Sequence, residues 1–205
     1  MSAGLTEYWL PPPHNNENGL DGDNDKSAHQ RAVLRRQQRA GVSIGTGMSG
    51  VREIANVVRL MDITATAGGS GYRKLPPYFV PSLLGNAAAS RVSLRYGLHG
   101  PNWTATTACA ASSHAIGDAA RCIQAGTADI MMLAGGAESC LDPLSVAGFA
   151  RLRALSTAYN HDPAAASRPF DAARDGFDMG EAGACVLVLE ELEHAVRRLG
   201  SGSAS

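Results

Sequence analysis

The chain has 205 residues, of which 44% are hydrophobic and 18% charged, and its formal net charge at pH 7 is −1. This balance excludes a disordered chain for the bulk of the sequence, and it lacks the basic excess of proteins that bind nucleic-acid phosphates. No apolar run approaches the roughly 20 residues of a membrane-spanning helix, and the N-terminus has no apolar signal segment. The four cysteines form no CxxC pair, so we expect free thiols in a reducing compartment and no zinc ribbon.

The first 40 residues differ in composition from the rest. The stretch Pro11–Asp25 is rich in Pro, Asn, Gly and Asp, which predicts a long exposed loop. A short polar helix is predicted over His29–Arg39, and its charges are interpreted as a solvated face. We therefore expect a poorly ordered N-terminal segment over residues 1–40, a folded domain over residues 41–200 and a flexible tail over residues 201–205.

From Gly41 onward, short apolar strands alternate with segments of helical periodicity. The predicted strands are Gly41–Gly45 with a glycine turn after it, Asn102–Ala108, Asp129–Ala134 and Ala184–Leu189, and we expect the first and the last two to be buried. The predicted helices are Val51–Met61, Leu83–Tyr96, Ala110–Gln124, one that starts at Asp142-Pro143, and Leu192–Leu199. This alternation predicts a layered α/β fold with a parallel or mixed sheet.

Two glycine turns follow predicted strands. Gly45-Thr-Gly-Met-Ser-Gly50 matches the dinucleotide fingerprint G-x-G-x-x-G and lies between a strand and a helix, where that motif belongs. The acidic ribose ligand should follow about 20 residues later, but Asp62 ends a helical pattern instead. The favoured interpretation is a tight turn where Cβ atoms would clash, and the same interpretation applies to Gly135-Gly136.

The segment from Thr106 to His114 carries the clearest chemical signal. Cys109 stands at a strand-to-helix junction, where the positive end of a helix dipole stabilises a thiolate. Small neighbours leave room for a substrate, and the backbone N–H of Cys109 can donate to an oxyanion. Thioester exchange is a natural use of such a nucleophile elbow. The residues alone leave a buried, inert cysteine equally open.

Several motifs in order resemble one family, the β-ketoacyl-acyl-carrier-protein synthases that elongate fatty acids. The resemblance extends over about Gly41–Gly200. Ser139-Cys140 followed by Pro143-Leu-Ser is most similar to the mitochondrial branch. The matching segments are Thr107-Ala-Cys-Ala110, His114-Ala-Ile-Gly-Asp-Ala119, Arg73–Pro81, Tyr96–Pro101, Ala134–Glu138, Gly148–Ser156, Ser167–Asp171, Arg174–Phe177 and Val188–Ala195.

The resemblance implies a thiolase-like layered α/β/α fold, of which this chain is the N-terminal half and therefore incomplete. It also implies an acyltransferase reaction, a decarboxylative Claisen condensation. Cys109 takes an acyl chain from an acyl-carrier protein as a thioester, and malonyl-carrier protein then loses carbon dioxide and attacks it. The product is a 3-oxoacyl chain two carbons longer. No metal or organic cofactor is expected.

Six site residues follow from the resemblance. Cys109 is the catalytic residue, Met48 lines the far end of the acyl pocket, and Ala108, Ser145 and Phe149 lie beside Cys109. Phe79 reaches across a homodimer interface into the partner's pocket. For Met48 and Phe149 the residues alone favour ordinary core packing. The implied partners are the acyl- and malonyl-loaded carrier protein and a second copy of the chain, with no nucleic acid and no membrane span.

The sequence departs from the family in its second half. Family chains continue for about as long again, and this sequence contains none of their His-Gly-Thr-Gly-Thr, Lys-x-x-x-Gly-His and Gly-Phe-Gly-Gly motifs. Of the six histidines, none has the context of those motifs, and His114 is expected to pack or cap locally. The family's first strand and helix are also absent before Gly41.

Three hypotheses therefore stand at this point. The first is a fatty-acid condensing enzyme that is truncated and inactive alone, in a mitochondrial or cytoplasmic location. The second is a non-catalytic chain that binds acyl chains or a pairing partner. The third is a dinucleotide-dependent oxidoreductase. A single half also predicts a large exposed apolar face, and hence aggregation or association.

Overall fold

The computed structural model describes residues 23–66, 68, 71–128 and 130–201. They form two compact units. The first comprises the described residues within Met1–Thr46, Asn86–Gly136 and Cys185–Ser205, and the second comprises those within Gly47–Gly85 and Ala137–Ala184.

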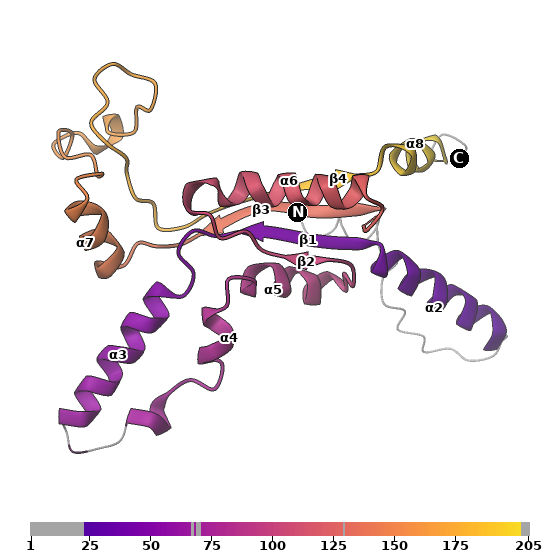
Figure 1. Ribbon diagram of the computed structural model, residues 1–205, viewed down its shortest axis with the longest axis horizontal. Coiled ribbons are helices and arrows are strands. Elements are labelled where there is room, and N and C mark those ends of the chain that lie inside the picture. Colours follow the sequence, from indigo (N-terminus) through magenta and orange to yellow (C-terminus); the bar gives the residue numbers. More distant parts are fainter. Residues whose placement is uncertain (1–22, 67, 69–70, 129, 202–205) are drawn as a thin grey trace. The chain divides into compact units, whose positions relative to one another are not determined.

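A four-stranded sheet in the order β2-β1-β3-β4 forms the frame of the first unit (Figure 1). Its strands are β1 (Ala40–Gly45), β2 (Asn102–Trp103), β3 (Met131–Glu138) and β4 (Gly183–Glu190). β1 pairs in parallel with β2 and with β3, with Val42 beside Leu133 in the register of the second pair. β4 runs antiparallel to β3, because the Glu191 N–H at its end donates to the Ile130 carbonyl at the start of β3 (3.0 Å). The sheet is therefore mixed, one of the two arrangements that the sequence leaves open.

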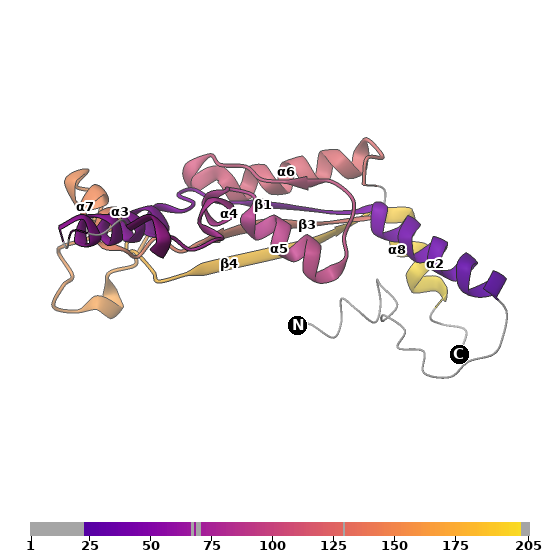
Figure 2. The same cartoon turned by 90° about the horizontal axis from the view of Figure 1, so that it is seen from below.

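Helices cover both faces of β1. α6 (Ala111–Gln124) packs on one face and α5 (Ala87–Tyr96) on the other (Figures 1 and 2). α2 (Asp23–Gln38) leads into β1, and α8 (Leu192–Ser201) follows β4. Every residue of β1 is consequently buried.

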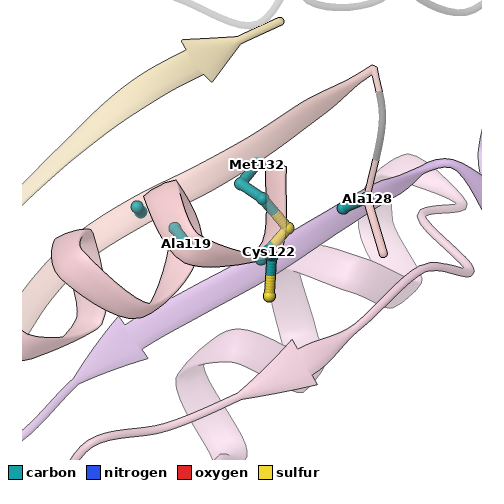
Figure 3. Packing of buried hydrophobic residues seen from close by; sticks show 5 residues of the cluster. Ala119, Cys122, Ala128 and Met132 are labelled. Carbon is teal, nitrogen blue, oxygen red and sulfur yellow. The ribbon is translucent and has the colours of Figure 1, made fainter. Parts of the chain in front are cut away.

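The core between α6 and the sheet is built from small and flexible side chains. Ala119 and Cys122 of α6 lie against Met132 and Ala134 of β3, with Ala128 beside them (Figure 3). Alanines at 115 and 119 are fully buried, so the helix axis can approach the sheet closely. Close packing of small side chains is consistent with the low aromatic content of the chain, which is 5%.

The second unit holds α3 (Val51–Thr66), α4 (Phe79–Leu83) and α7 (Pro143–Arg151), with short 3-10 turns at Gly71–Lys74 and Pro163–Ala165. Asp142 caps α7 as the sequence predicts: its carboxylate accepts from the Leu144 and Ser145 N–H groups, both at 3.0 Å. Such caps satisfy donors that the first helical turn leaves free.

Three predicted elements differ from the structure. The strand predicted over Asn102–Ala108 is only two residues long; beyond it the Thr46 N–H donates to the Ala105 carbonyl (3.0 Å), and a 3-10 segment follows at Ala108–Ala110. The helix predicted over Leu83–Tyr96 is broken at Leu84, whose extended backbone (ψ 131°) separates α4 from α5. α2 begins at Asp23, inside the stretch where a loop is predicted, and Pro11–Gly22 lie outside the described residues.

β4 is the largest difference. It is a strand, as predicted, but it is not buried: Val186, Leu187 and Val188 are 43%, 45% and 47% exposed. It lies at the edge of the sheet, beyond the helices that cover β1. An apolar sequence predicts a strand whose side chains are covered by other elements. Among the described residues, β4 is covered only in part.

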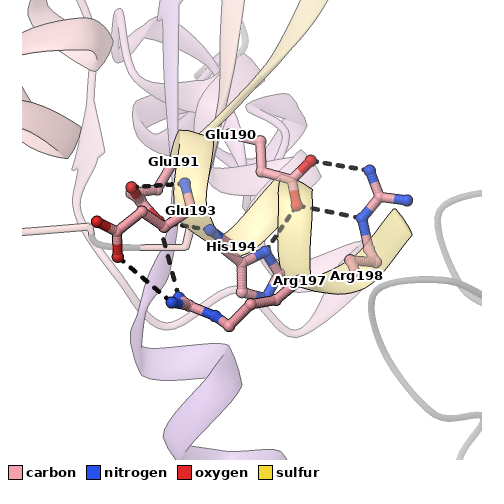
Figure 4. A network of polar contacts seen from close by, with 6 residues as sticks. All are labelled: Glu190, Glu191, Glu193, His194, Arg197 and Arg198. Atoms are coloured by element: carbon pink, nitrogen blue, oxygen red, sulfur yellow. Dashed lines mark hydrogen bonds and ion pairs between the residues drawn. The ribbon is translucent and has the colours of Figure 1, made fainter. Parts of the chain in front are cut away.

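A polar cluster fixes the corner between β4 and α8 (Figure 4). The Glu191 carboxylate accepts from the N–H groups of Glu193 (2.9 Å) and His194 (2.6 Å), which caps α8. Glu190 accepts two hydrogen bonds from the Arg198 guanidinium (3.1 and 2.9 Å), and its Oε1 lies 2.6 Å from His194 Nδ1.

Candidate active site

Cys109 lies immediately before the N-terminus of α6, with its side chain exposed. Ala108, just before it, has φ of 50°, one of two positive φ values at non-glycine residues in the described part of the chain. A left-handed residue at this point makes a sharp turn, so that the thiol is presented ahead of the helix. The first N–H groups of a helix have no intrahelical acceptors, and the dipole places about half a positive charge there. The geometry favours the nucleophile elbow and is inconsistent with a buried cysteine.

Two glycines allow α6 to come this close to the sheet. A Cβ on Gly45 would meet the Ala111 carbonyl at the start of α6, and a Cβ on Gly136 would lie 2.7 Å from Ser112 Cβ. Neither distance is compatible with a real side chain. Both glycine turns are therefore packing features under the helix that carries Cys109. This confirms the favoured interpretation of the fingerprint at Gly45 and removes the main support for a dinucleotide site.

His114 is held by the loop in front of its own helix. Its Nδ1 lies 2.7 Å from Thr107 Oγ1, which ties the first turns of α6 to the segment before Cys109. This contact agrees with the prediction that His114 packs or caps locally.

The other cysteines have different surroundings. Burial and then the nearby Asp118 carboxylate raise the pKa of the Cys122 thiol. Burial raises the pKa of Cys140 as well, with added contributions from Glu138 and Asp142. Cys185 is exposed on β4. A raised pKa leaves less of the reactive thiolate at neutral pH.

In the second unit, a carboxylate holds the turn that contains Met48. Glu138 Oε2 accepts from the N–H groups of Gly47 (2.6 Å) and Met48 (3.1 Å). Gly50, in the same turn, has φ of 74° and would place a Cβ 2.9 Å from Leu83 Cδ2. The sequence places Glu138 at the end of a matching segment and predicts no role for it. The available signal was an acidic residue shortly after the Gly135-Gly136 pair, at the end of the strand.

Ser145 and Phe149 lie on α7. Ser145 is 2% exposed, and its hydroxyl donates to Asp142 Oδ2 at 2.6 Å, so its hydrogen bond completes the helix cap. These bonds from Ser145, with that from the Leu144 N–H, hold the pKa of Asp142 below its usual range. Phe149 packs edge-to-face on Phe177, with ring centroids 5.2 Å apart.

Phe79 is the first residue of α4 and is half-buried, between the exposed Tyr78 and Val80. Of the six predicted site residues, Cys109 and Ala108 thus lie in the first unit, and the other four lie in the second. The acyl pocket remains a prediction.

The described residues bring together no group of three or more side chains suited to a metal ion. Within the same ranges, every helix is too short or too polar to cross a bilayer.

Comparison with protein families shows to which family the chain belongs. Residues 24–195 match the family described as "Beta-ketoacyl synthase, N-terminal domain". The chain belongs to the β-ketoacyl synthase family. Its fold is accordingly the N-terminal portion of the thiolase-like ketosynthase fold.

Curated β-ketoacyl synthases match most of this chain. The mitochondrial 3-oxoacyl-[acyl-carrier-protein] synthase of Arabidopsis thaliana is 52% identical over 162 residues, which cover 79% of this chain and 33% of that protein. The 3-oxoacyl-[acyl-carrier-protein] synthase 2 of Rhizobium meliloti is 51% identical over 158 residues, or 77% of this chain and 36% of that protein. The chain therefore spans about a third of the length of these relatives.

Solved ketosynthase structures agree with the fold. A β-ketoacyl synthase from Burkholderia phymatum superposes with a TM-score of 0.65 at 36% identity, covering 88% of this chain and 40% of that one. A type II polyketide ketosynthase, in complex with its acyl-carrier protein and bound to a hexaketide, gives a TM-score of 0.70 at 29% identity. That match covers 82% of this chain and 43% of the solved one.

Proposed function

We propose that this chain carries the acyl-accepting cysteine of a 3-oxoacyl-acyl-carrier-protein synthase. The single observation that supports this most strongly is the exposed Cys109 thiol at the N-terminus of α6, behind a left-handed Ala108. Its family membership supplies the reaction in which such a thiol is used.

In the first proposed step, the Cys109 thiolate attacks the carbonyl carbon of an acyl-carrier thioester. A new carbon–sulfur bond forms, and the oxyanion accepts hydrogen bonds from N–H groups near the helix start. The bond to the carrier's sulfur then breaks, and the carrier leaves as a thiolate that takes a proton from solvent. In the second step, malonyl-carrier protein loses carbon dioxide. The resulting carbanion attacks the acyl carbon and expels Cys109 as a thiolate, which gives a 3-oxoacyl-carrier protein.

The pocket around this chemistry follows from the resemblance. Met48 would line the far end of the acyl chain, and Ala108, Ser145 and Phe149 would lie near the thioester. Phe79 would belong to the partner's pocket in a homodimer. The acyl-carrier protein would be the partner that delivers both substrates. Location follows the relatives, some of which are named mitochondrial.

The sequence contains no motif for the histidines and lysine that the resemblance assigns to decarboxylation. We therefore expect the chain to accept an acyl group on Cys109 but to form no 3-oxoacyl product by itself, since a missing general acid–base group typically costs 100- to 10,000-fold in rate.

The test is an incubation with an acyl-carrier protein thioester, followed by mass measurement of the intact chain and its peptides. Acyl transfer to the peptide of Cys109, lost in Cys109→Ser and kept in Cys185→Ser, would support the proposal. Cys185 is the matched control because it is also exposed. Acylation that is absent, or spread equally over the exposed cysteines, would contradict it. Efficient condensation after malonyl-carrier protein is added would overturn the prediction that the chain is inactive alone.

A second candidate is a non-catalytic chain that pairs with another protein or binds acyl chains. The exposed apolar surface of β4 favours it. Under this alternative, Cys109→Ser would leave partner binding unchanged.

A further inference from the structure

A carboxylate at the end of β3 holds the turn that precedes α3. β1 ends at Gly45 and α3 begins at Val51, so the residues between them belong to neither element. Glu138 Oε2 accepts from the N–H groups of Gly47 (2.6 Å) and Met48 (3.1 Å), which lie 91 and 90 residues away in the sequence. N–H groups of successive residues that converge on one anion form a well-defined binding concavity. One charged oxygen therefore restrains two neighbouring peptide groups.

The other contacts of this turn come from Leu83, the last residue of α4. Gly50 has φ of 74° and would place a Cβ 2.9 Å from Leu83 Cδ2. Ser49 Oγ donates to the Leu83 carbonyl at 3.4 Å, which is long for a hydroxyl hydrogen bond. Hydrogen bonds to a carboxylate are shorter and stronger than bonds between neutral groups. Glu138 is therefore the main polar restraint on the backbone of Met48.

We propose that Glu138 is a positioning residue that sets the length of the acyl chain which Cys109 can accept. This rests on the proposed function, in which Met48 lines the far end of the acyl pocket. A side chain limits the length of a bound chain only if its own backbone stays in place. One methylene group more or less in an apolar pocket changes a rate by roughly 10- to 200-fold, so a small movement of Met48 is enough to alter selectivity.

Removal of the carboxylate would free one side of the turn. In Glu138→Ala, the N–H groups of Gly47 and Met48 lose their acceptor, whereas the contacts of Ser49 and Gly50 with Leu83 remain. The turn would stay attached beside α4 while Met48 moves. Longer chains would then be accepted at Cys109.

Alkylation of Cys109 by N-alkyl iodoacetamides tests this role without requiring acyl transfer. The thiolate displaces iodide and forms a carbon–sulfur bond to the acetamide carbon. The full chain is treated with a series of alkyl groups from butyl to octadecyl, in the presence of N-acetylcysteine. The ratio of the rate at Cys109 to that of the soluble thiol is measured for each length, which corrects for the reactivity and solubility of each probe.

We expect a cut-off in the wild type, that is, a length beyond which this ratio falls. In Glu138→Ala the cut-off should move to longer chains, and the ratio at the first length that the wild type excludes should rise at least about tenfold. An unfolded chain would show no cut-off at all, so a displaced cut-off separates positioning from loss of the fold. Glu138→Gln keeps an acceptor oxygen without the charge and should give an intermediate displacement. Glu181→Ala removes an exposed carboxylate from the same unit and should give none.

Three results would overturn the proposal: a wild type without a cut-off, an unchanged cut-off in Glu138→Ala, or an equal displacement in Glu181→Ala. If circular dichroism shows that Glu138→Ala is unfolded, Glu138→Gln decides, and an unchanged cut-off there would overturn the proposal as well. Failure of the proposed function is a different result. In that case the cut-off would depend on Glu138, but an acyl-carrier thioester would transfer no acyl group to Cys109.

Discussion

β3 and β4 are neighbours in one sheet, and both are apolar strands that the sequence predicts to be buried. Met131 to Ala134 of β3 are at most 2% exposed, and two of them, Met132 and Ala134, pack against small side chains of α6. Val186 to Val188 of β4 are 43–47% exposed. An apolar run therefore indicates a strand whose side chains require covering, whereas the cover itself depends on which other elements are present.

The ends of the two strands show a second difference. β3 ends at Glu138, which accepts hydrogen bonds from the backbone of another segment at Gly47 and Met48. β4 ends at Glu190, which pairs with Arg198 and His194 of the helix that follows it. Glu138 at the end of β3 thus holds a turn that is far away in the sequence. Glu190 at the end of β4 holds only the helix that follows it.

The largest effect is expected where α6 covers the sheet. Gly45→Val would drive a side chain into the Ala111 carbonyl and push α6 away from β1. Overpacking of this kind costs about 3 kcal/mol, and the backbone here cannot yield as a side chain could. Urea unfolding followed by circular dichroism measures the loss.

The matched control is Gly148→Ala, because a Cβ at Gly148 meets nothing within 4 Å and α7 gains a better helix former. Its stability should stay the same or rise. If Gly45→Val unfolded at the wild-type urea concentration, the close approach of α6 to β1 would be wrong.

A smaller effect is expected at the end of β3. Glu138→Ala leaves the Gly47 and Met48 N–H groups without their carboxylate acceptor, at a cost of about 2 kcal/mol. Hydrogen exchange of those two amides should accelerate. Glu181→Ala, which removes an exposed carboxylate from the same unit, should leave their exchange unchanged. Equal protection in both variants would show that Glu138 does not hold this turn.

A still smaller effect, dependent on pH, is expected at the end of β4. Burial alone raises the pKa of Glu190, but its bonds to Arg198 and His194 outweigh this and hold the pKa below its usual range. The unfolded chain therefore binds this proton more readily, so the stabilisation is present above the unfolded pKa and is lost as pH falls through the folded pKa. At neutral pH, Glu190→Gln should cost about 1.5 kcal/mol.

The measurement is the unfolding free energy of wild type and Glu190→Gln as pH falls from 7 to 3. The gap between the two should close toward the acidic end, because the wild-type carboxylate becomes neutral there. Glu193→Gln is the control: its side chain is 80% exposed, and its ion pair with Arg197 should contribute little. A gap that stays constant across this range would contradict the role of the charge.

Much of this fold follows from local signals in the sequence. Asp142-Pro143 marks the start of α7 because an acidic cap and a proline suit the first helical turn, and Gly97 ends α5 with φ of 62°. The junction at Cys109 is predicted for the same kind of reason. Local signals do not predict three other features. These are the break at Leu84, the exposure of β4, and the hydrogen bonds that Glu138 accepts from the turn at Gly47 and Met48. They depend on contacts between segments tens of residues apart, which periodicity does not report.

Competitive alkylation tests whether Cys109 is presented ahead of α6 as a reactive thiol. The full chain is treated with limiting iodoacetamide at several pH values, and the rate at each cysteine is followed by mass spectrometry. We predict that Cys109 reacts at least ten times faster than the other three at neutral pH. The Cys109 thiol is exposed ahead of the helix, whereas burial and neighbouring carboxylates raise the pKa of Cys122 and Cys140. Equal rates at all four cysteines, or at Cys109 and the exposed Cys185, would show that the position of Cys109 does not make it more reactive.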